Sequence, residues 1–268
     1  MKLLKKKSKP VRLFKGNCFE VMKSLPDCSV ELVLTDPPYF NSDKTRADWD
    51  KNFSFEAFWE EVSRVLKPNG AVVMFGNEPF SSIARLSNQS WYKYDIKWVK
   101  NRATGFANAN YRPMNKYEDI MVFSPANASA GGKNNPMTYN PQGLIPVNKV
   151  KKNSANRQGS IGERTNNLGK NNSLLAEGSS YTQKYTNYPP NVVEFQCDTT
   201  HYHPTQKPEA LLEYLVLTYS NEGDTVLDCF MGSGSTGVAC IHTNRKFIGI
   251  ELDDKYFEVA EQRCREVP

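Results

Sequence analysis

Hydrophobic residues in the N-terminal part of the chain occur in two short runs joined by a segment with helical spacing. The runs VELVLT (30–35) and AVVMF (71–75) are apolar and rich in β-branched residues, which is typical of buried strands. Pro68-Asn69-Gly70 ends the helix predicted between them, and a shorter helix is predicted over Phe19 to Leu25. The longer helix is indicated by apolar residues three and four apart: Phe55, Phe58, Trp59, Val62 and Leu66.

The alternation of strands and helices returns near the C-terminus. Strands that alternate with helices form parallel sheets with helices on both faces. We therefore predict an α/β fold with a mostly parallel, doubly wound sheet. The elements predicted in this part are a helix, a strand, a helix, a strand and a helix: Glu209 to Tyr219, TVLDC (225–229), a helix ending at His242, KFIGIE (246–251) and Lys255 to Arg265.

Residues 126–191 differ from the segments on either side. They contain thirteen asparagines and few large apolar residues, so this stretch cannot form a sizeable core of its own. Eight Lys or Arg residues stand there against two acids, a net charge of +6 where the whole chain has +5. We predict a catalytic domain made of residues 1–124 and 198–268. Residues 125–197 are then a loop-rich or partly disordered insertion that recognises the target.

Composition restricts the class of protein further. With 268 residues, 39% of them hydrophobic, the chain is long enough for one substantial core, and its net charge of +5 favours a polyanionic partner. The six cysteines are scattered without a CxxC pair, so we expect reduced thiols and no metal site. The basic N-terminus lacks a following apolar stretch, and no run approaches the length of a membrane span. We expect a soluble, cytoplasmic protein.

A glycine-rich loop follows the strand TVLDC. Residues 230–237 read FMGSGSTG, which fits GxGxxG at the opening of a helix, where glycine lets a ligand lie close to bare backbone. Nineteen residues past Gly232, Glu251 ends the next strand, where a carboxylate accepts hydrogen bonds from ribose hydroxyls. This order predicts a nucleotide-type cofactor site. An NAD-dependent dehydrogenase shares the fingerprint and remains an alternative.

The motif Asp36-Pro37-Pro38-Tyr39 comes directly after the strand VELVLT, at the edge where open α/β folds bind ligands. Alone, it is typical of a strand-ending turn. Asp36 and the carbonyl of Pro37 can accept the two N–H bonds of an exocyclic amine and so orient its delocalised lone pair. Tyr39 can stack on a base that has rotated out of the duplex. Catalysis would then come from positioning, without a covalent enzyme intermediate.

Together these segments resemble the DNA amino-methyltransferases of the β-type order. In that order, DPPY lies near the N-terminus, the target-recognition region follows, and the cofactor loop comes last. The matching stretches cover about two thirds of the chain: GNCFEVMKSLPDCSVELVLTDPPY (16–39), FWEEVSRVLKPNGAVVMF (58–75), TGFANANYRPMNKYEDIMVF (104–123), HPTQKPEALLEYLVLTYSNEGDTVLDCFMGSGSTGVA (203–239) and FIGIELD (247–253).

The resemblance implies a Rossmann-like methyltransferase fold and transfer of a methyl group from S-adenosylmethionine to double-stranded DNA. Asp36 favours the N6 amino group of adenine, while cytosine N4 stays open as the alternative. A cognate restriction endonuclease and a homodimer are left open as partners, in a prokaryotic or phage-encoded system. The basic insertion is expected to contact DNA through four cations: Lys149, Lys151, Lys152 and Arg157.

The resemblance also implies cofactor contacts. Glu251 corresponds to the ribose ligand, and Lys207 is a natural partner for the cofactor's carboxylate. Asn17 and Cys18 lie where the family usually has Asp before Cys, so this contact loses its charge, and Cys229 stands where proline or asparagine is commoner. The remaining expected contacts come from the glycine loop and the HPTQKP segment: Asp228, Phe230, Gly232, Ser233, Gly234, His203 and Thr205.

Three other classes differ at single features. Methylation at cytosine carbon 5 uses a cysteine after proline, and none of the six cysteines here follows proline. Protein-glutamine methyltransferases carry Asn before the two prolines, where this chain has Asp36. A DNA-binding module without activity remains an alternative, against which the intact DPPY and glycine loop argue.

Overall fold

The computed structural model describes residues 11–39, 53–129, 134–152, 180–200 and 202–267. The chain divides into two compact units. The first contains Met1–Asn140 and Pro190–Pro268, and the second contains Pro141–Pro189.

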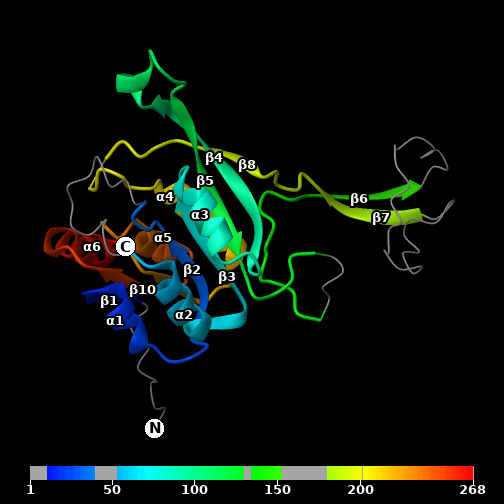
Figure 1. The fold of residues 1–268 in the computed structure, drawn as a ribbon. Coiled ribbons are helices and arrows are strands. Elements are labelled where there is room, and N and C mark those ends of the chain that lie inside the picture. The colour runs from blue at the N-terminus through cyan, green and yellow to red at the C-terminus, as the bar shows by residue number, and fades with distance from the viewer. Residues whose placement is uncertain (1–10, 40–52, 130–133, 153–179, 201, 268) are drawn as a thin grey trace, which may run out of the picture. The chain divides into compact units, whose positions relative to one another are not determined.

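An eight-stranded sheet forms the centre of the first unit (Figure 1). Its first five strands are parallel to one another, β5 runs antiparallel to both neighbours, and β8 is parallel to β4. This mostly parallel sheet confirms the predicted α/β class. The strands, in spatial order, are β1 (Val11–Lys15), β10 (Lys246–Glu251), β9 (Thr225–Asp228), β2 (Val30–Thr35), β3 (Leu66–Gly76), β5 (Asn115–Phe123), β4 (Tyr92–Thr104) and β8 (Val192–Phe195).

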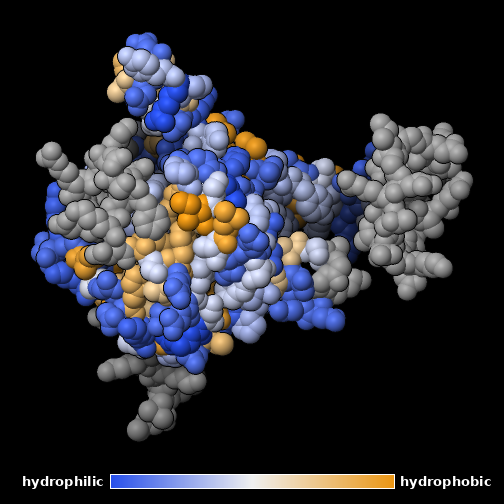
Figure 2. Space-filling view, in the orientation of Figure 1, coloured by the Kyte–Doolittle hydropathy of each residue, from blue (hydrophilic) through white to orange (hydrophobic). Residues whose placement is uncertain are grey.

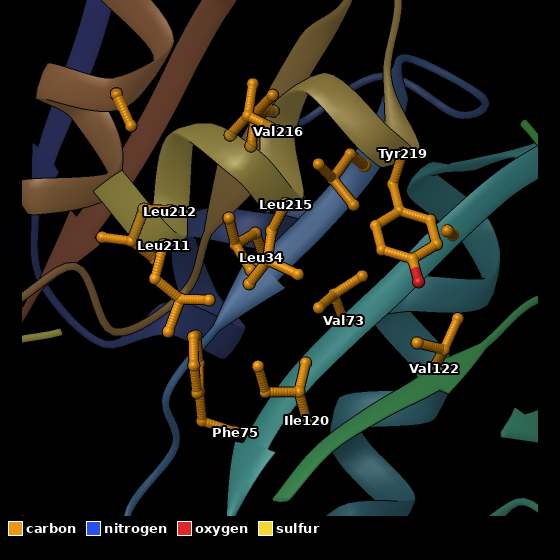
Figure 3. Packing of buried hydrophobic residues seen from close by; sticks show 14 of the residues in the cluster. Leu34, Val73, Phe75, Ile120, Val122, Leu211, Leu212, Leu215, Val216 and Tyr219 are labelled. Carbon is orange, nitrogen blue, oxygen red and sulfur yellow. The ribbon is translucent and has the colours of Figure 1, made fainter. Parts of the chain in front are cut away.

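Helices cover both faces of the sheet, because successive strand residues point to opposite sides. On one face, Leu34 and Val73 pack in a cluster with α4, α5 and α6. On the other face, Val33 and Val72 pack with α1, α2 and α3. Figure 3 shows the first cluster, in which the apolar side chains of α4 lie over strands β2, β3 and β5. The helices are α1 (Cys18–Lys23), α2 (Phe55–Val65), α3 (Phe80–Ser87), α4 (Glu209–Tyr219), α5 (Ser235–His242) and α6 (Asp254–Glu266).

Strand β3 begins at Leu66, five residues before the predicted AVVMF run. Leu66 has extended backbone angles and pairs with Val30 across a register shift. Pro68 disfavours helical geometry at the residue before it, so the chain leaves α2 earlier than the apolar spacing predicted. The predicted helix at α4 and the predicted strand at β10 have the observed bounds.

Strands β4 and β5 form a long antiparallel hairpin that the sequence analysis did not predict. Asp119 of β5 pairs with Gly76 of β3 on one side and with Lys97 of β4 on the other. Past the Gly76–Asp119 pair, where β3 ends, the hairpin continues, and it projects from the body of the unit in Figure 1. A short 3-10 helix, η2 (Phe106–Asn108), lies at its turn.

The second unit is described by its own antiparallel pair, β6 (Ile145–Lys152) and β7 (Ser180–Thr186). Its bounds, 141–189, are narrower than the predicted insertion of residues 125–197. Ala126 and Met137 are buried in the core of the first unit, and β8 belongs to the main sheet. The loop-rich prediction therefore missed strands in this region, and its part in target recognition stays a prediction.

Candidate active site

Three acidic residues lie at the carboxyl edge of the parallel strands. Asp228 ends β9, Glu251 ends β10, and Asp36 follows β2 directly. The Thr35 hydroxyl donates to Asp228 Oδ1 over 3.0 Å, and the backbone N–H of Phe230 donates to the same oxygen over 3.1 Å. The DPPY segment and the glycine loop are thus tied to one carboxylate, which places them side by side.

Asp36 accepts a hydrogen bond on each carboxylate oxygen. Tyr39 donates its hydroxyl to Oδ1, and Lys207 donates its ammonium to Oδ2. Burial, together with the charges of Asp36 and Glu118, raises the pKa of Tyr39 well above its usual value. Tyr39 therefore remains a protonated donor that fixes the orientation of the Asp36 carboxylate.

The Tyr39 ring is held by packing as well as by its hydroxyl. Its centroid lies 5.0 Å from that of Phe80 at an interplanar angle of 34°. Pro37 and Pro38 are both buried, and proline fixes the backbone torsion at each position. The four DPPY residues predicted to act together are therefore held by burial, ring packing and proline's fixed torsion.

Lys207 lies between two carboxylates, which the sequence analysis did not foresee. Its ammonium pairs with Asp36 and lies 3.5 Å from Glu118 Oε2, while Lys100 pairs with the other oxygen of Glu118. Burial alone would lower the pKa of Lys207, but the charges of Asp36 and Glu118 outweigh it and raise that pKa. The result is a row of alternating charges whose two central members, Lys207 and Glu118, are buried: Asp36, Lys207, Glu118 and Lys100.

Glu118 and Lys100 are site residues that sequence reasoning missed. Burial would raise the pKa of Glu118, yet the two neighbouring ammonium groups lower it, so the carboxylate stays ionised. The one available signal was the acid pair Glu118-Asp119 immediately before the apolar run of β5. A buried charge needs a partner, and that rule would have singled out this pair once β5 was recognised as a buried strand.

The Asp228 carboxylate accepts hydrogen bonds from residues at the start of the glycine loop and of the helix that follows it. Besides Thr35 and Phe230, Thr236 of α5 donates to its Oδ2 over 2.7 Å. Burial raises the pKa of Asp228 to about 6, against the opposing effect of these hydrogen bonds. Its carboxylate therefore joins β2, β9 and α5 into one support for the loop.

The glycine loop has the backbone conformation that its sequence predicted. Gly232 and Gly234 have φ angles of 51° and 79°, in the left-handed region that favours glycine. A Cβ on Gly234 would lie 2.9 Å from the Cβ of Ala260 in α6, so a larger residue has no room there. Arg263 of α6 also donates to the carbonyl of Ser233 over 2.7 Å and to its hydroxyl over 3.0 Å. Arg263 is a buried support of the loop that the sequence analysis did not identify.

Glu251 is fixed by the backbone of two neighbouring turns. Gly232 donates its N–H to Oε2 over 2.9 Å, and Asp253 donates to Oε1 over 2.8 Å. Burial raises the pKa of Glu251, and these backbone N–H groups oppose that rise. Each carboxylate oxygen keeps a second lone pair for a further donor, such as a ribose hydroxyl.

The HPTQKP segment lies against the glycine loop. His203 Nδ1 accepts from the Thr205 N–H over 3.2 Å, and a Cβ added to Gly232 would lie 3.9 Å from the His203 ring. Burial lowers the pKa of His203, which favours the neutral ring. The structure therefore brings His203, Thr205 and Lys207 to the same edge as Glu251. Their contacts with a cofactor stay a prediction, and the Lys207 ammonium, predicted to bind the cofactor's carboxylate, pairs with Asp36 and Glu118 of this chain.

Asn17 and Cys18 have structural roles in the described contacts. Asn17 Oδ1 accepts from the N–H of Phe19 over 2.9 Å and so caps the N-terminus of α1. The Cys18 thiol is buried, which raises its pKa to about 12. They follow Gly16, whose N–H donates to the carbonyl of Glu251 over 2.9 Å, so both residues lie beside the end of β10, and their part in cofactor binding stays a prediction.

The predicted DNA-binding lysines belong to the second unit. Lys149 and Lys151 are exposed on β6, two residues apart and therefore on the same face of the strand. Lys152 ends that strand, and Arg157 lies outside the described residues. Their contact with DNA stays a prediction.

Two further observations concern the part of the chain that the structure describes. The helices there are too short or too polar to cross a membrane. The same residues contain no cluster of three or more His, Cys, Asp or Glu side chains arranged for a metal ion, and all six cysteines are free thiols.

Comparison with known proteins identifies the family. The profile of the DNA methylase family matches residues 30–262. Type II methyltransferase M.HpaI of Haemophilus parainfluenzae is 32% identical over 270 residues, covering 94% of this chain and 73% of that protein. Type II methyltransferase M.HinfI of Haemophilus influenzae is 29% identical over 281 residues, covering 95% of this chain and 68% of that protein.

The fold and the cofactor class agree with this match. The crystal structure of the M1.HpyAVI–SAM complex superimposes with a TM-score of 0.61 at 25% identity, covering 94% of this chain and 99% of that one. The glycine loop therefore belongs to a methyltransferase, which favours this reaction over the NAD-dependent alternative. The chain belongs to the family of S-adenosylmethionine-dependent DNA methylases that act on amino nitrogens, adenine N6 or cytosine N4, as the sequence predicted.

Proposed function

We propose that the protein methylates the N6 amino group of adenine in double-stranded DNA, with Asp36 as the residue that grips the amine. The observation that carries this proposal is the contact between Asp36 Oδ2 and the Lys207 ammonium. This contact supports the proposal because it shows that the carboxylate accepts an N–H donor at the edge of the sheet, beside the glycine loop. A free lone pair on each oxygen can accept one more N–H from a base.

The residues at this edge fit the family's cofactor. Glu251 offers a carboxylate that two backbone N–H groups hold in place, which suits a pair of ribose hydroxyls. A Cβ added to Gly232 would meet the His203 ring at 3.9 Å, so His203 packs against the loop, and the two can line one side of the bound cofactor together. When bound, S-adenosylmethionine supplies an electrophilic methyl group on a sulfonium centre.

The chain's own residues supply positioning for the reaction. Asp36 and the Pro37 carbonyl accept the two N–H bonds of the amine and turn its lone pair toward the methyl group. As positive charge develops on the nitrogen, the Asp36 carboxylate stabilises it, and the departing proton leaves through that acceptor to water. Tyr39 holds the carboxylate with its hydroxyl, and its ring, which packs beside Phe80, is proposed to stack on the base.

The second unit is proposed to recognise the DNA target. Lys149 and Lys151 alternate with exposed Val150 on β6, so cations and apolar surface occupy opposite faces of one strand. Lysines contact phosphates without reading sequence, so base recognition would come from other groups on this unit. A restriction endonuclease partner, a homodimer and a cytoplasmic location remain predictions of the resemblance.

The test is methyl transfer from labelled S-adenosylmethionine to plasmid DNA from a host without DNA methylases. Digestion to nucleosides and mass spectrometry should detect N6-methyladenine. N4-methylcytosine would redirect the assignment to the cytosine amino group, and no label in DNA would overturn the proposal. An Asp36→Ala variant should bind the cofactor in calorimetry but transfer no methyl group. Undiminished transfer would remove Asp36 from the mechanism.

A further inference from the structure

The end of the β4–β5 hairpin carries large apolar side chains that the fold leaves exposed. We call residues 101–117 the hairpin tip. Phe106 is 81% exposed and Tyr111 is 88% exposed, and Met114 and Tyr117 are exposed beside them. Exposed large side chains gathered on one projection indicate a contact surface, because folding alone gains nothing from them.

The hairpin tip leaves the sheet without neighbouring strands. Strand β8 pairs with β4 only as far as Lys100, and β3 ends opposite Asp119. Residues 101–104 continue β4 past these pairs, and after a register shift Thr104 pairs with Asn115 of β5, so the ladder extends two residues of β5, or about 7 Å at about 3.3 Å per residue, past Tyr117. Deep blue and pale orange surfaces adjoin each other on this projection in Figure 2.

The charge on the hairpin tip is entirely positive. Residues 101–117 contain Arg102, Arg112 and Lys116 and no Asp or Glu. All three cations are exposed. Cations that alternate with exposed aromatic rings suit a nucleic acid, whose phosphates attract the former and whose bases stack on the latter. A membrane surface or an acidic protein would attract the cations, but neither offers bases to stack on the exposed aromatic rings.

The hairpin tip also projects from the edge of the sheet that carries Asp36. Strand β4 runs parallel to β3, so its carboxyl end leaves the sheet at the same edge as the ends of β2, β9 and β10. DNA that presents a base to Asp36 must lie over this edge. A base that leaves the duplex creates a gap, and an inserted apolar side chain can fill such a gap.

We infer that the hairpin tip inserts Phe106 or Tyr111 into the duplex next to the target base, while Arg102, Arg112 and Lys116 contact the flanking phosphates. This inference rests on the proposed function and names a second DNA contact, separate from the one proposed for β6. Gly105, with a φ of 91°, allows the sharp turn that presents Phe106 at the end of the projection.

The first experiment compares Phe106→Ala and Tyr111→Ala with Leu86→Ala, an exposed residue at the far end of α3. At least one of the two tip variants should lose tenfold or more in methyl transfer to duplex plasmid DNA, with unchanged cofactor affinity and melting temperature. Leu86→Ala should stay within twofold of wild type. Wild-type rates in both tip variants and in the double variant would overturn the inference.

The second experiment does not depend on methyl transfer. A photoreactive phenylalanine, placed at position 106 in one variant and at position 111 in another, should cross-link to duplex DNA in at least one of them, and Arg112→Gln should reduce the salt dependence of DNA binding by about one phosphate contact. Lys23→Gln, at the end of α1 away from Asn17, should leave that slope unchanged. A cross-link only to a second copy of the protein, or no cross-link to DNA, would overturn the inference. If wild-type protein transferred no methyl group yet cross-linked to DNA, the proposed function would fail while this contact stood.

Discussion

Replacing Lys207 with methionine tests the row of alternating charges at the site. Lys207 is 8% exposed and pairs with Asp36 and Glu118. Methionine keeps much of the side-chain volume but removes the ammonium, which leaves two carboxylates on either side of an apolar group. We therefore expect Lys207→Met to lower the free energy of unfolding, with the loss largest near neutral pH.

The magnitude follows from the geometry. The two oxygens that share the ammonium can lie no more than about 6 Å apart, and like charges at that separation repel by about 3 kcal/mol at an effective dielectric constant of about 20. Breaking a buried pair by removing one partner costs about 3–5 kcal/mol. Lys100 still pairs with Glu118, and the Asp36 side chain keeps 23% of its exposure to water, so the lower end of this range applies.

The sign of the pH dependence separates this cause from a simple loss of packing. In the wild type the pKa of Glu118 lies below 4.5, so its contribution to stability is present above pH 4.5 and lost as pH falls through the lowered value. Without Lys207, burial raises the pKa of Glu118, and protonation then relieves the repulsion as the solution becomes acidic. The difference between wild type and variant should therefore shrink from pH 8 to pH 5.

Urea unfolding at these two pH values is the assay. A loss of about 3 kcal/mol shifts the midpoint by about 1 M for a slope near 3 kcal/mol/M. Lys97→Met is the matched control, since its side chain is 35% exposed and Arg85 still pairs with Asp119. We expect the control to lose about 1 kcal/mol or less. Equal losses in the two variants, or a loss at Lys207 that does not change with pH, would refute the reasoning.

The remaining predictions concern the proposed roles of single residues. Asp36→Asn should lower the methyl-transfer rate by about a hundredfold or more, as loss of a preorganised group does elsewhere, with cofactor affinity unchanged in calorimetry. Glu251→Gln should weaken S-adenosylmethionine binding about tenfold, since a charge-assisted hydrogen bond is replaced by a neutral one, and normal affinity would exclude the ribose contact. Changing both Lys149 and Lys151 to Gln should lower the salt slope of DNA binding by about 2, and an unchanged slope would remove β6 from the interface.

The parallel half of the fold could be predicted because its signals are local. Leu34 and Val33 belong to one apolar run, and the run alone indicates a strand covered on both faces. The glycine loop and DPPY are likewise contiguous motifs whose position at strand ends follows from the order of elements. The two segments meet in the structure because the carboxyl ends of parallel strands share one edge.

The hairpin and its charges could not be predicted in the same way. Strand β4 contains Lys97 and Lys100 among its aromatic residues, so its pattern indicates neither a buried nor an alternating strand. Its lysines are tolerated because Asp119 and Glu118 on β5 pair with them across the ladder. These ion pairs depend on how the two strands are aligned with each other. A pattern within one segment carries no information about that alignment.

The same pairings connect the DNA contact that we infer to the carboxylate that we propose for catalysis. Lys100 and Glu118 lie where the hairpin leaves the sheet, and Glu118 meets Lys207, which holds Asp36. If Lys100 and Glu118 moved away from Lys207, the buried Glu118 carboxylate would lose one of its two cationic partners. A buried charge with fewer partners destabilises the folded protein. These ion pairs therefore oppose such movement, and we expect them to couple DNA bound at the hairpin tip to a base held at Asp36.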